Sequence, residues 1–148
     1  MTQSLSQVHV HIVFSTKNIQ KLIPENLRDA LQRYIIGCLH SIESHVEAIY
    51  INPDHLHILC TLPRTIPIMT LVTKIKSPSS IWMKKHGSPS FSWQGGYAIF
   101  SVSKSNLSMV KRYILNQPNH HKQVGYKEEL MFFLNKLGIE YQEQYLWD

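Results

Sequence analysis

The chain has 148 residues, 43% of them hydrophobic, and carries a formal net charge of +5 at pH 7. This length and composition are typical of one folded domain over residues 1–148 and exclude a disordered chain. Two cysteines, Cys38 and Cys60, are too few for a disulfide framework or a Cys-rich zinc site. The sequence shows neither a signal-peptide pattern at its start nor an apolar run approaching the roughly 20 residues of a membrane span. We therefore expect a soluble cytoplasmic protein.

Hydrophobic periodicity predicts strands and helices along the whole chain. Alternating apolar residues predict each strand, and apolar residues spaced three and four apart predict each helix. The turn residues Asn52, Pro53 and Asp54 join two of the strands into a tight hairpin. In chain order the predicted elements are a strand at 7–15, a helix at 24–44, strands at 45–51 and 55–62, a helix at 67–86, a strand at 97–104 and helices at 106–117 and 126–138.

The first six predicted elements follow the order of a ferredoxin-like split βαβ fold, in the α+β class. This fold is an antiparallel sheet packed with helices, with the first and third strands adjacent at its centre. Two C-terminal helices follow, and the first of them carries Tyr113. Pro78 is expected to bend or break the second helix, and Pro118 to end the helix that contains Tyr113. Many functions share this fold, so function has to be argued from particular residues.

The charged residues are unevenly distributed along the chain. Between His55 and Lys127 there is no aspartate or glutamate. A solvated surface normally mixes charges of both signs, so this half of the chain predicts a polyanionic partner, of which nucleic acid is the commonest. Chance in a mildly basic protein is the alternative. The segment holds ten of the fifteen basic residues: Arg64, Lys74, Lys76, Lys84, Lys85, Lys104, Lys111, Arg112, Lys122 and Lys127.

Two His-x-His pairs lie on predicted strands: His55 and His57 on the third, and His9 and His11 on the first. Side chains two residues apart on a strand share a face, roughly 6–7 Å apart, which suits two imidazoles that bind one metal ion. His55 and His57 directly follow a Pro-Asp turn, where a ligand can reach them. An isolated pair is nevertheless more often structural, so a metal site needs a third ligand. We expect His11 to be structural or to lie near the site, and not to bind the metal.

The helix at 106–117 offers one candidate for that ligand. Tyr113 and Gln117 are four residues apart and share a helix face. The Gln117 amide oxygen can coordinate a metal ion while Tyr113 reaches a phosphate bound to the same ion. The spacing fits equally well an ordinary amphipathic tyrosine at a helix–sheet boundary, so spacing alone does not decide the role of Tyr113.

Several short motifs occur in a fixed order along the chain. They are His11–Lys17 (HIVFSTK), Asp54–His57 (DHLH), Ser79–Trp82 (SSIW), Trp93–Tyr97 (WQGGY) and Tyr113–Gln117 (YILNQ), followed by His120 and His121. In this order and at these separations they resemble the single-tyrosine transposases of the smallest single-stranded insertion sequences. These form the IS200 class of the HUH (His-hydrophobe-His) endonuclease superfamily, with the repeat-associated tyrosine transposases as close cousins. The resemblance covers nearly the whole chain, from about residue 11 to about residue 130.

The resemblance implies a DNA transposase that cleaves single-stranded DNA and rejoins it through a 5′-phosphotyrosine intermediate. The family's nucleophile corresponds to Tyr113, its metal-binding pair to His55 and His57, and its third metal ligand to Gln117. The implied metal is Mg²⁺ or Mn²⁺. The implied partners are DNA hairpins at the element ends and a second copy of the chain in a homodimer, in which the tyrosine helix of one protomer can act in trans.

Other basic residues are predicted to contact DNA, because phosphate contacts require only a positive charge or a hydrogen-bond donor. The lysines of the second predicted helix make this region the expected hairpin-binding surface. The predicted DNA contacts are Lys74, Lys76, Lys84, Lys85, Lys111, Arg112, His120 and His121.

Two other functions remain open on the sequence. One is a non-catalytic nucleic-acid-binding protein built on a ferredoxin-like sheet, which the charge pattern favours equally. The other is a small metal-dependent hydrolase that uses water, with a structural Tyr113. Mg²⁺ prefers oxygen ligands, so a site of two histidines and one glutamine is expected to bind metal weakly until a DNA phosphate adds its oxygens.

Overall fold

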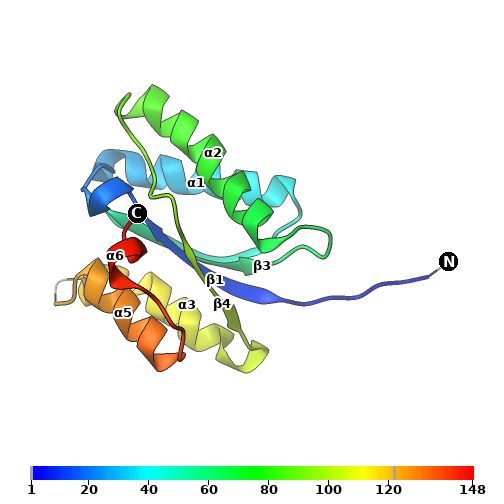
Figure 1. Cartoon of the computed structure of the whole chain (residues 1–148). Helices are drawn as coiled ribbons and strands as arrows, with labels where there is room; N and C mark the ends of the chain where they lie inside the picture. Colours follow the sequence, from blue (N-terminus) through cyan, green and yellow to red (C-terminus); the bar gives the residue numbers. More distant parts are fainter. Residues whose placement is uncertain (1, 122) are drawn as a thin grey trace.

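Four strands form one antiparallel sheet in the order β2-β3-β1-β4. This order confirms the predicted split βαβ arrangement, with β1 and β3 adjacent at the centre (Figure 1). The computed structural model describes residues 2–121 and 123–148, so Lys122 of the acid-free segment lies outside the described residues. The strands are β1 (His9–Ser15), β2 (Val46–Ile51), β3 (His55–Thr61) and β4 (Ala98–Val102).

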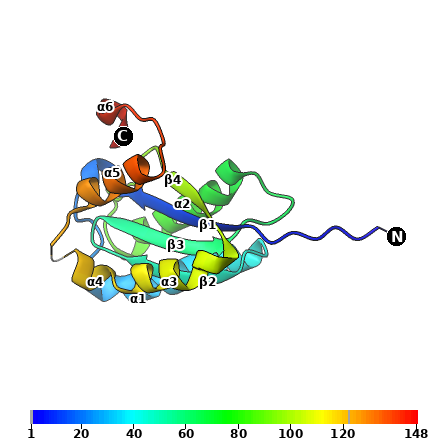
Figure 2. The same ribbon diagram turned by 90° about the horizontal axis from the view of Figure 1, so that it is seen from below.

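Helices cover both faces of the sheet, as Figures 1 and 2 show. The helices α1 (Glu25–Ser41) and α2 (Ile68–His86) lie on one face. The helices α3 (Leu107–Leu115) and α5 (Tyr126–Lys136) lie on the other. The sequence did not predict the remaining short elements, which are η1 (Lys17–Ile19), η2 (Lys104–Asn106), α4 (Gln117–His120) and α6 (Glu143–Leu146).

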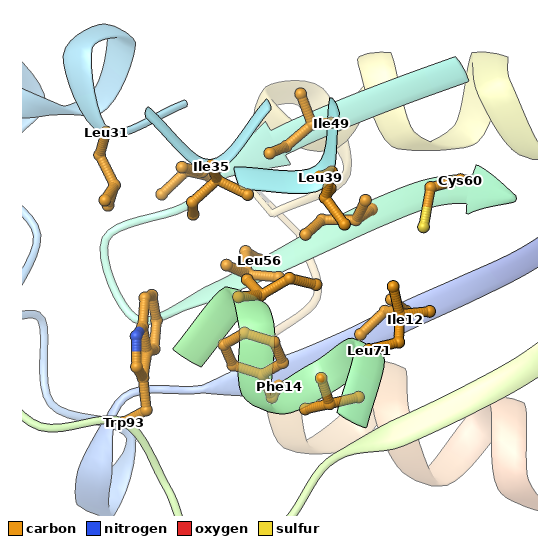
Figure 3. Packing of buried hydrophobic residues seen from close by; sticks show 14 of the residues in the cluster. Ile12, Phe14, Leu31, Ile35, Leu39, Ile49, Leu56, Cys60, Leu71 and Trp93 are labelled. Carbon is orange, nitrogen blue, oxygen red and sulfur yellow. The ribbon is translucent and has the colours of Figure 1, made fainter. Parts of the chain in front are cut away.

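The central strands are covered on both sides, so their side chains alternate between two cores. Ile12 and Phe14 point into the larger core beneath α1 and α2 (Figure 3), whereas Val13 packs against α5. The same alternation on β3 sends Leu56 into the larger core. The next residue, His57, therefore points toward α5, where it contacts Glu129. The candidate imidazoles are thus buried between the sheet and the C-terminal helices.

Two prolines affect the helices differently from what the sequence predicts. The helix α2 continues through Pro78, so the expected break does not occur. Ile75 and Ser79, on either side of this proline, are buried, and their packing offsets the lost backbone hydrogen bond. The helix α3 ends at Leu115, and Pro118 lies instead in the first turn of α4, where a proline costs no helical hydrogen bond.

The loop before β4 is held by hydrogen bonds to α2 and β1. Trp93 Nε1 donates to Ser79 Oγ at 2.9 Å. Lys76 Nζ donates to the backbone carbonyl of Gln94 at 2.7 Å. The Gln94 side chain accepts from the backbone N–H of Ser15 at 2.8 Å. These contacts give Ser79, Trp93 and Gln94, which belong to the sequence motifs, a structural role beside the central strand.

The two cysteines are free thiols. Cys38 is partly buried on α1 and Cys60 is buried on β3. Burial raises the pKa of the Cys60 thiol to about 11, so it is protonated and unreactive at neutral pH. Within residues 2–121 and 123–148, we find no helix that combines the length and the hydropathy needed to span a membrane.

Candidate active site and metal centre

Three histidines and one glutamate converge between the sheet and α5. His55 and His57 come from β3, His121 follows α4, and Glu129 lies on α5. One nitrogen or oxygen atom from each of these side chains lies within 4.8 Å of the others. His55, His57 and Glu129 are each at most 3% exposed. The predicted histidine pair is thus joined by an imidazole and a carboxylate from distant parts of the chain.

The Glu129 carboxylate is the hub of this cluster. Its Oε1 lies 2.8 Å from His57 Nε2 and 3.4 Å from His55 Nε2. Its Oε2 lies 3.2 Å from His121 Nε2 and 3.1 Å from His120 Nε2. Burial alone would raise the pKa of Glu129, but hydrogen bonds from the surrounding imidazoles hold it well below its usual range. The buried carboxylate is therefore ionised.

Two of the histidines point their Nε2 atoms into the cluster. His55 Nδ1 donates to Asp54 Oδ1 at 2.6 Å, and His121 Nδ1 donates to the Val124 carbonyl at 2.6 Å. Both partners only accept, so each Nδ1 carries a proton, and Nε2 is the nitrogen that faces Glu129 and can bind a metal ion once it carries no proton. Asn52 Nδ2, which only donates, lies 3.1 Å from His55 Nε2 and agrees with this assignment. Metal-binding histidines are commonly oriented in this way.

Tyr113 reaches the cluster from α3. Ile114 packs in a core with residues of β2 and β3 and brings this helix against the sheet. The Tyr113 hydroxyl donates to Glu129 Oε2 and lies 3.3 Å from His120 Nε2. Its ring lies 5.8 Å from the ring of His57, measured between centroids. Burial and the negative charge of Glu129 raise the pKa of Tyr113, so the phenol is protonated at neutral pH.

Gln117 is fully buried beside the same carboxylate. Its Nε2 donates to Glu129 Oε2 at 3.2 Å, and its Oε1 accepts from Asn52 Nδ2 at 3.2 Å. The Gln117 amide nitrogen thus faces the cluster. Rotation of the amide group by half a turn would point its oxygen at the cluster instead. Tyr113 and Gln117 lie in one site with the histidine pair, although the assignment of Gln117 as a ligand stays a prediction.

The predicted DNA contacts lie in three different surroundings. On α2, which covers the far face of the sheet, Lys74 is exposed whereas Lys76 binds loop carbonyls, and burial lowers the pKa of Lys76 to about 8. His120 and His121 lie at the cluster itself. The remaining predicted contacts are exposed side chains on α2 or α3, namely Lys84, Lys85, Lys111 and Arg112.

Sequence reasoning missed Glu129 and did not assign His121 to the cluster. The segment from His55 to Lys127 contains no carboxylate, and Glu129 lies just beyond its end. A signal was nevertheless present. Tyr126, Leu130 and Leu134 form the apolar stripe of the last predicted helix, and Glu129 lies on the same buried face. A charged residue in such a stripe indicates a buried partner.

Solved structures of similar fold include two transposases. A crystal structure provisionally assigned to a transposase of Deinococcus radiodurans R1 has a TM-score of 0.61 and 20% identity, covering 79% of this chain and 98% of that chain. A REP-associated tyrosine transposase bound to a REP hairpin has a TM-score of 0.62 and 16% identity, covering 84% of this chain and 76% of that chain. At these identities the likeness establishes a shared fold. No curated protein matches the chain significantly.

The sheet order and the two helical layers therefore define a fold that DNA transposases use. Residues 4–117 match the family described as Transposase IS200 like. The chain belongs to the IS200-like transposase family. The matched stretch contains His55, His57 and Tyr113, whereas His121 and Glu129 follow it.

Proposed function

We propose that this transposase cuts and rejoins single-stranded DNA through a covalent phosphotyrosine on Tyr113, beside a divalent cation bound at the histidine cluster. One observation carries the proposal. The Tyr113 hydroxyl donates to the same Glu129 carboxylate that contacts His55 and His57. The nucleophile and the metal-type ligands therefore share one buried partner, as expected when a cation and an attacking oxygen act on one phosphate.

The donor set fits Mg²⁺ or Mn²⁺ better than the sequence alone suggested. Glu129 adds a charged oxygen ligand, which both ions prefer, to the imidazoles of His55, His57 and His121. When bound, the cation would polarise the non-bridging phosphate oxygens and stabilise the charge of the transition state. We propose these four side chains as ligands. Gln117, the ligand implied by the family resemblance, stays a predicted ligand, and in this structure its amide donates to Glu129.

The chemistry of cutting needs one bond made and one bond broken. The Tyr113 oxygen attacks phosphorus and forms a 5′-phosphotyrosine, while the bond to the 3′ oxygen breaks and releases a 3′-hydroxyl. The Tyr113 hydroxyl donates a hydrogen bond to Glu129 that orients it; its proton passes to water, and the departing 3′ oxygen takes a proton from water. Because the new ester conserves the energy of the old one, the 3′-hydroxyl of another strand can reverse the step and join DNA without ATP.

Hairpin DNA is the proposed substrate, since one of the structural neighbours is a tyrosine transposase bound to a REP hairpin. A homodimer is also proposed, because a chain with one nucleophilic tyrosine forms one covalent link at a time, and moving an element requires two cuts. Light scattering of the purified protein, alone and with hairpin DNA, tests the dimer directly.

The covalent intermediate provides the test of function. End-labelled single-stranded DNA carrying hairpins from the flanks of the coding sequence is incubated with the protein and Mn²⁺ or Mg²⁺, then resolved on a denaturing gel. We expect a labelled protein band that is lost in Tyr113→Phe and His57→Ala. Tyr126→Phe is the matched control, because this nearby buried tyrosine points its hydroxyl at Gln94, 3.4 Å away, and should retain the band.

Each other result would overturn the proposal in a recognisable way. Binding of hairpin DNA with no covalent band would identify a non-catalytic binding protein. Cleavage that survives in Tyr113→Phe would identify a hydrolase that uses water. A covalent band that persists in Tyr113→Phe and disappears in Tyr126→Phe would show that the nucleophile is Tyr126 and not Tyr113.

A further inference from the structure

His11 binds the nitrogen of His57 that points away from the cluster. His11 Nε2 lies 2.8 Å from His57 Nδ1, and the two rings stack with centroids 5.1 Å apart. Both side chains are buried, with exposed fractions of 3% and 0%. Phe100 and Phe133 pack edge-on against the other sides of the His11 ring. His11, expected from the sequence to be structural or near the site, therefore makes a polar contact to a proposed metal ligand.

The outer nitrogens of the three cluster histidines have different kinds of partner. His55 Nδ1 is bound to a carboxylate and His121 Nδ1 to a backbone carbonyl, and both of these groups can only accept. The tautomers of these two rings are therefore fixed. The outer nitrogen of His57 instead faces a second imidazole, which can either donate or accept. The contact with His11 is therefore compatible with a proton on either nitrogen of His57.

The contacts of His57 define the tautomer without metal. His57 Nε2 lies 2.8 Å from Glu129 Oε1, a carboxylate oxygen that accepts, so the His57 proton is on Nε2. His57 Nδ1 must then accept, and the proton between the two rings belongs to His11 Nε2. A metal ligand needs the lone pair on His57 Nε2, and its proton must then be on Nδ1.

We propose that His11 is a positioning residue that stabilises each tautomer of His57 in turn. Without metal, His11 Nε2 donates to His57 Nδ1. When His57 Nε2 is a metal ligand, His11 Nε2 accepts from His57 Nδ1. The proposal rests on the proposed metal site. In the change, His57 loses the Nε2 proton to water and receives the His11 proton on Nδ1, while His11 gains a proton on its own Nδ1 from water. The pair neither gains nor loses a proton overall.

The surroundings of His11 suit this role. The ring lines a cavity of about 530 Å³ between α3 and α5, which gives water a route to a residue otherwise enclosed by aromatic rings. A neutral imidazole can reverse a hydrogen bond through one nitrogen because it has two tautomers, which no apolar residue of that size can do.

Metal affinity tests the proposal without reference to DNA cleavage. Titration of Mn²⁺, followed by electron paramagnetic resonance or calorimetry, should show an affinity about 10–100-fold lower for His11→Phe than for the unaltered protein, the usual effect of losing a partner behind a metal ligand. His9→Phe is the matched control, because His9 is buried two residues earlier on the same strand and pairs with Thr61 and Val102. It should bind Mn²⁺ within threefold of the unaltered protein.

The tautomers can also be observed directly in the unaltered protein, so the proposal stays testable if His11→Phe fails to fold. Long-range ¹H–¹⁵N spectra of histidine-labelled protein should show the His57 proton on Nε2 without metal and on Nδ1 with Mg²⁺. Unchanged Mn²⁺ affinity in folded His11→Phe, or a His57 proton that does not move, would overturn the role of His11 alone. No binding of Mn²⁺ to the unaltered protein would overturn the metal site itself.

Discussion

Replacing Glu129 by glutamine keeps the shape of the side chain and removes its charge. The carboxylate is 3% exposed and contacts four imidazoles and the Tyr113 hydroxyl. A glutamine can still accept from His57 through its oxygen. The NH₂ group of the glutamine, however, only donates, and it would replace the oxygen that accepts from the Tyr113 hydroxyl. Glu129→Gln therefore removes hydrogen bonds of the cluster without opening a cavity.

We expect Glu129→Gln to lower the free energy of unfolding of the metal-free protein by about 2–4 kcal/mol at pH 7. Hydrogen bonds to a charged group contribute about 1.5–3 kcal/mol, and removing one member of a buried charge network costs about 3–5 kcal/mol. The neutral amide avoids the desolvation of an ion, which reduces the loss. The pKa of Glu129 is lower in the folded than in the unfolded chain, so its contribution is present above the unfolded pKa and disappears as the pH falls. The two proteins should therefore converge in acid.

Mn²⁺ adds a second, separable difference. A ligand at 100 times its dissociation constant stabilises the folded state by about 2.7 kcal/mol. If loss of the carboxylate raises that constant about 100-fold, the same Mn²⁺ concentration contributes only about 0.4 kcal/mol. Metal removal by a chelator should therefore destabilise the unaltered protein much more than Glu129→Gln.

Urea unfolding at pH 7, with and without Mn²⁺, measures both effects. Glu128→Gln is the control, because it removes the same charge from an exposed neighbour on the same helix and should behave as the unaltered protein. The reasoning is refuted if Glu129→Gln unfolds within about 1 kcal/mol of the unaltered protein and gains the same stability from Mn²⁺, a loss well below that expected of a broken buried charge network.

Three further predictions concern the metal, the α2 lysines and the loop before β4. Mn²⁺ affinity should fall as the pH drops and a proton competes with the metal ion for His55. Burial lowers the pKa of His55, but its hydrogen bonds to Asp54 and Glu129 raise it further, above the usual imidazole value, and calorimetry across pH 5.5–8 checks this. Lys76→Met should lower the free energy of unfolding by about 1–2 kcal/mol, because Lys76 donates to loop carbonyls. It should weaken hairpin DNA binding less than Lys84→Met, and DNA titrations at two salt concentrations measure this difference. Trp93→Phe should cost about 1–3 kcal/mol in thermal unfolding by leaving the buried Ser79 hydroxyl without its donor, and an unchanged midpoint would contradict that structural role.

Local patterns in the sequence were sufficient for the order of the main elements. The period of two along β1 and β3 and the helical spacing along α1 and α2 are properties of neighbouring residues, and they led to the split βαβ topology. The period of two correctly assigned His55 and His57 to one face. Tyr113 and Gln117 both contact Glu129, but they lie on two helices, α3 and α4, and not on one face of a single helix as predicted. Pro78 misled the prediction because the backbone cost of a proline is local, whereas the packing that offsets it comes from α1 and the sheet.

The composition of the site was decided by tertiary structure. A period tells which face a side chain takes, but it does not tell which distant element covers that face. Burial of the apolar stripe of α5 against β1 and β4 carries Glu129 onto His57, although 72 positions separate the two residues. The register of β1 on β3 likewise brings His11 behind His57. The sequence by itself therefore determined the histidine pair and the tyrosine, whereas the carboxylate and the imidazole that orient them depend on long-range packing, which no local pattern encodes.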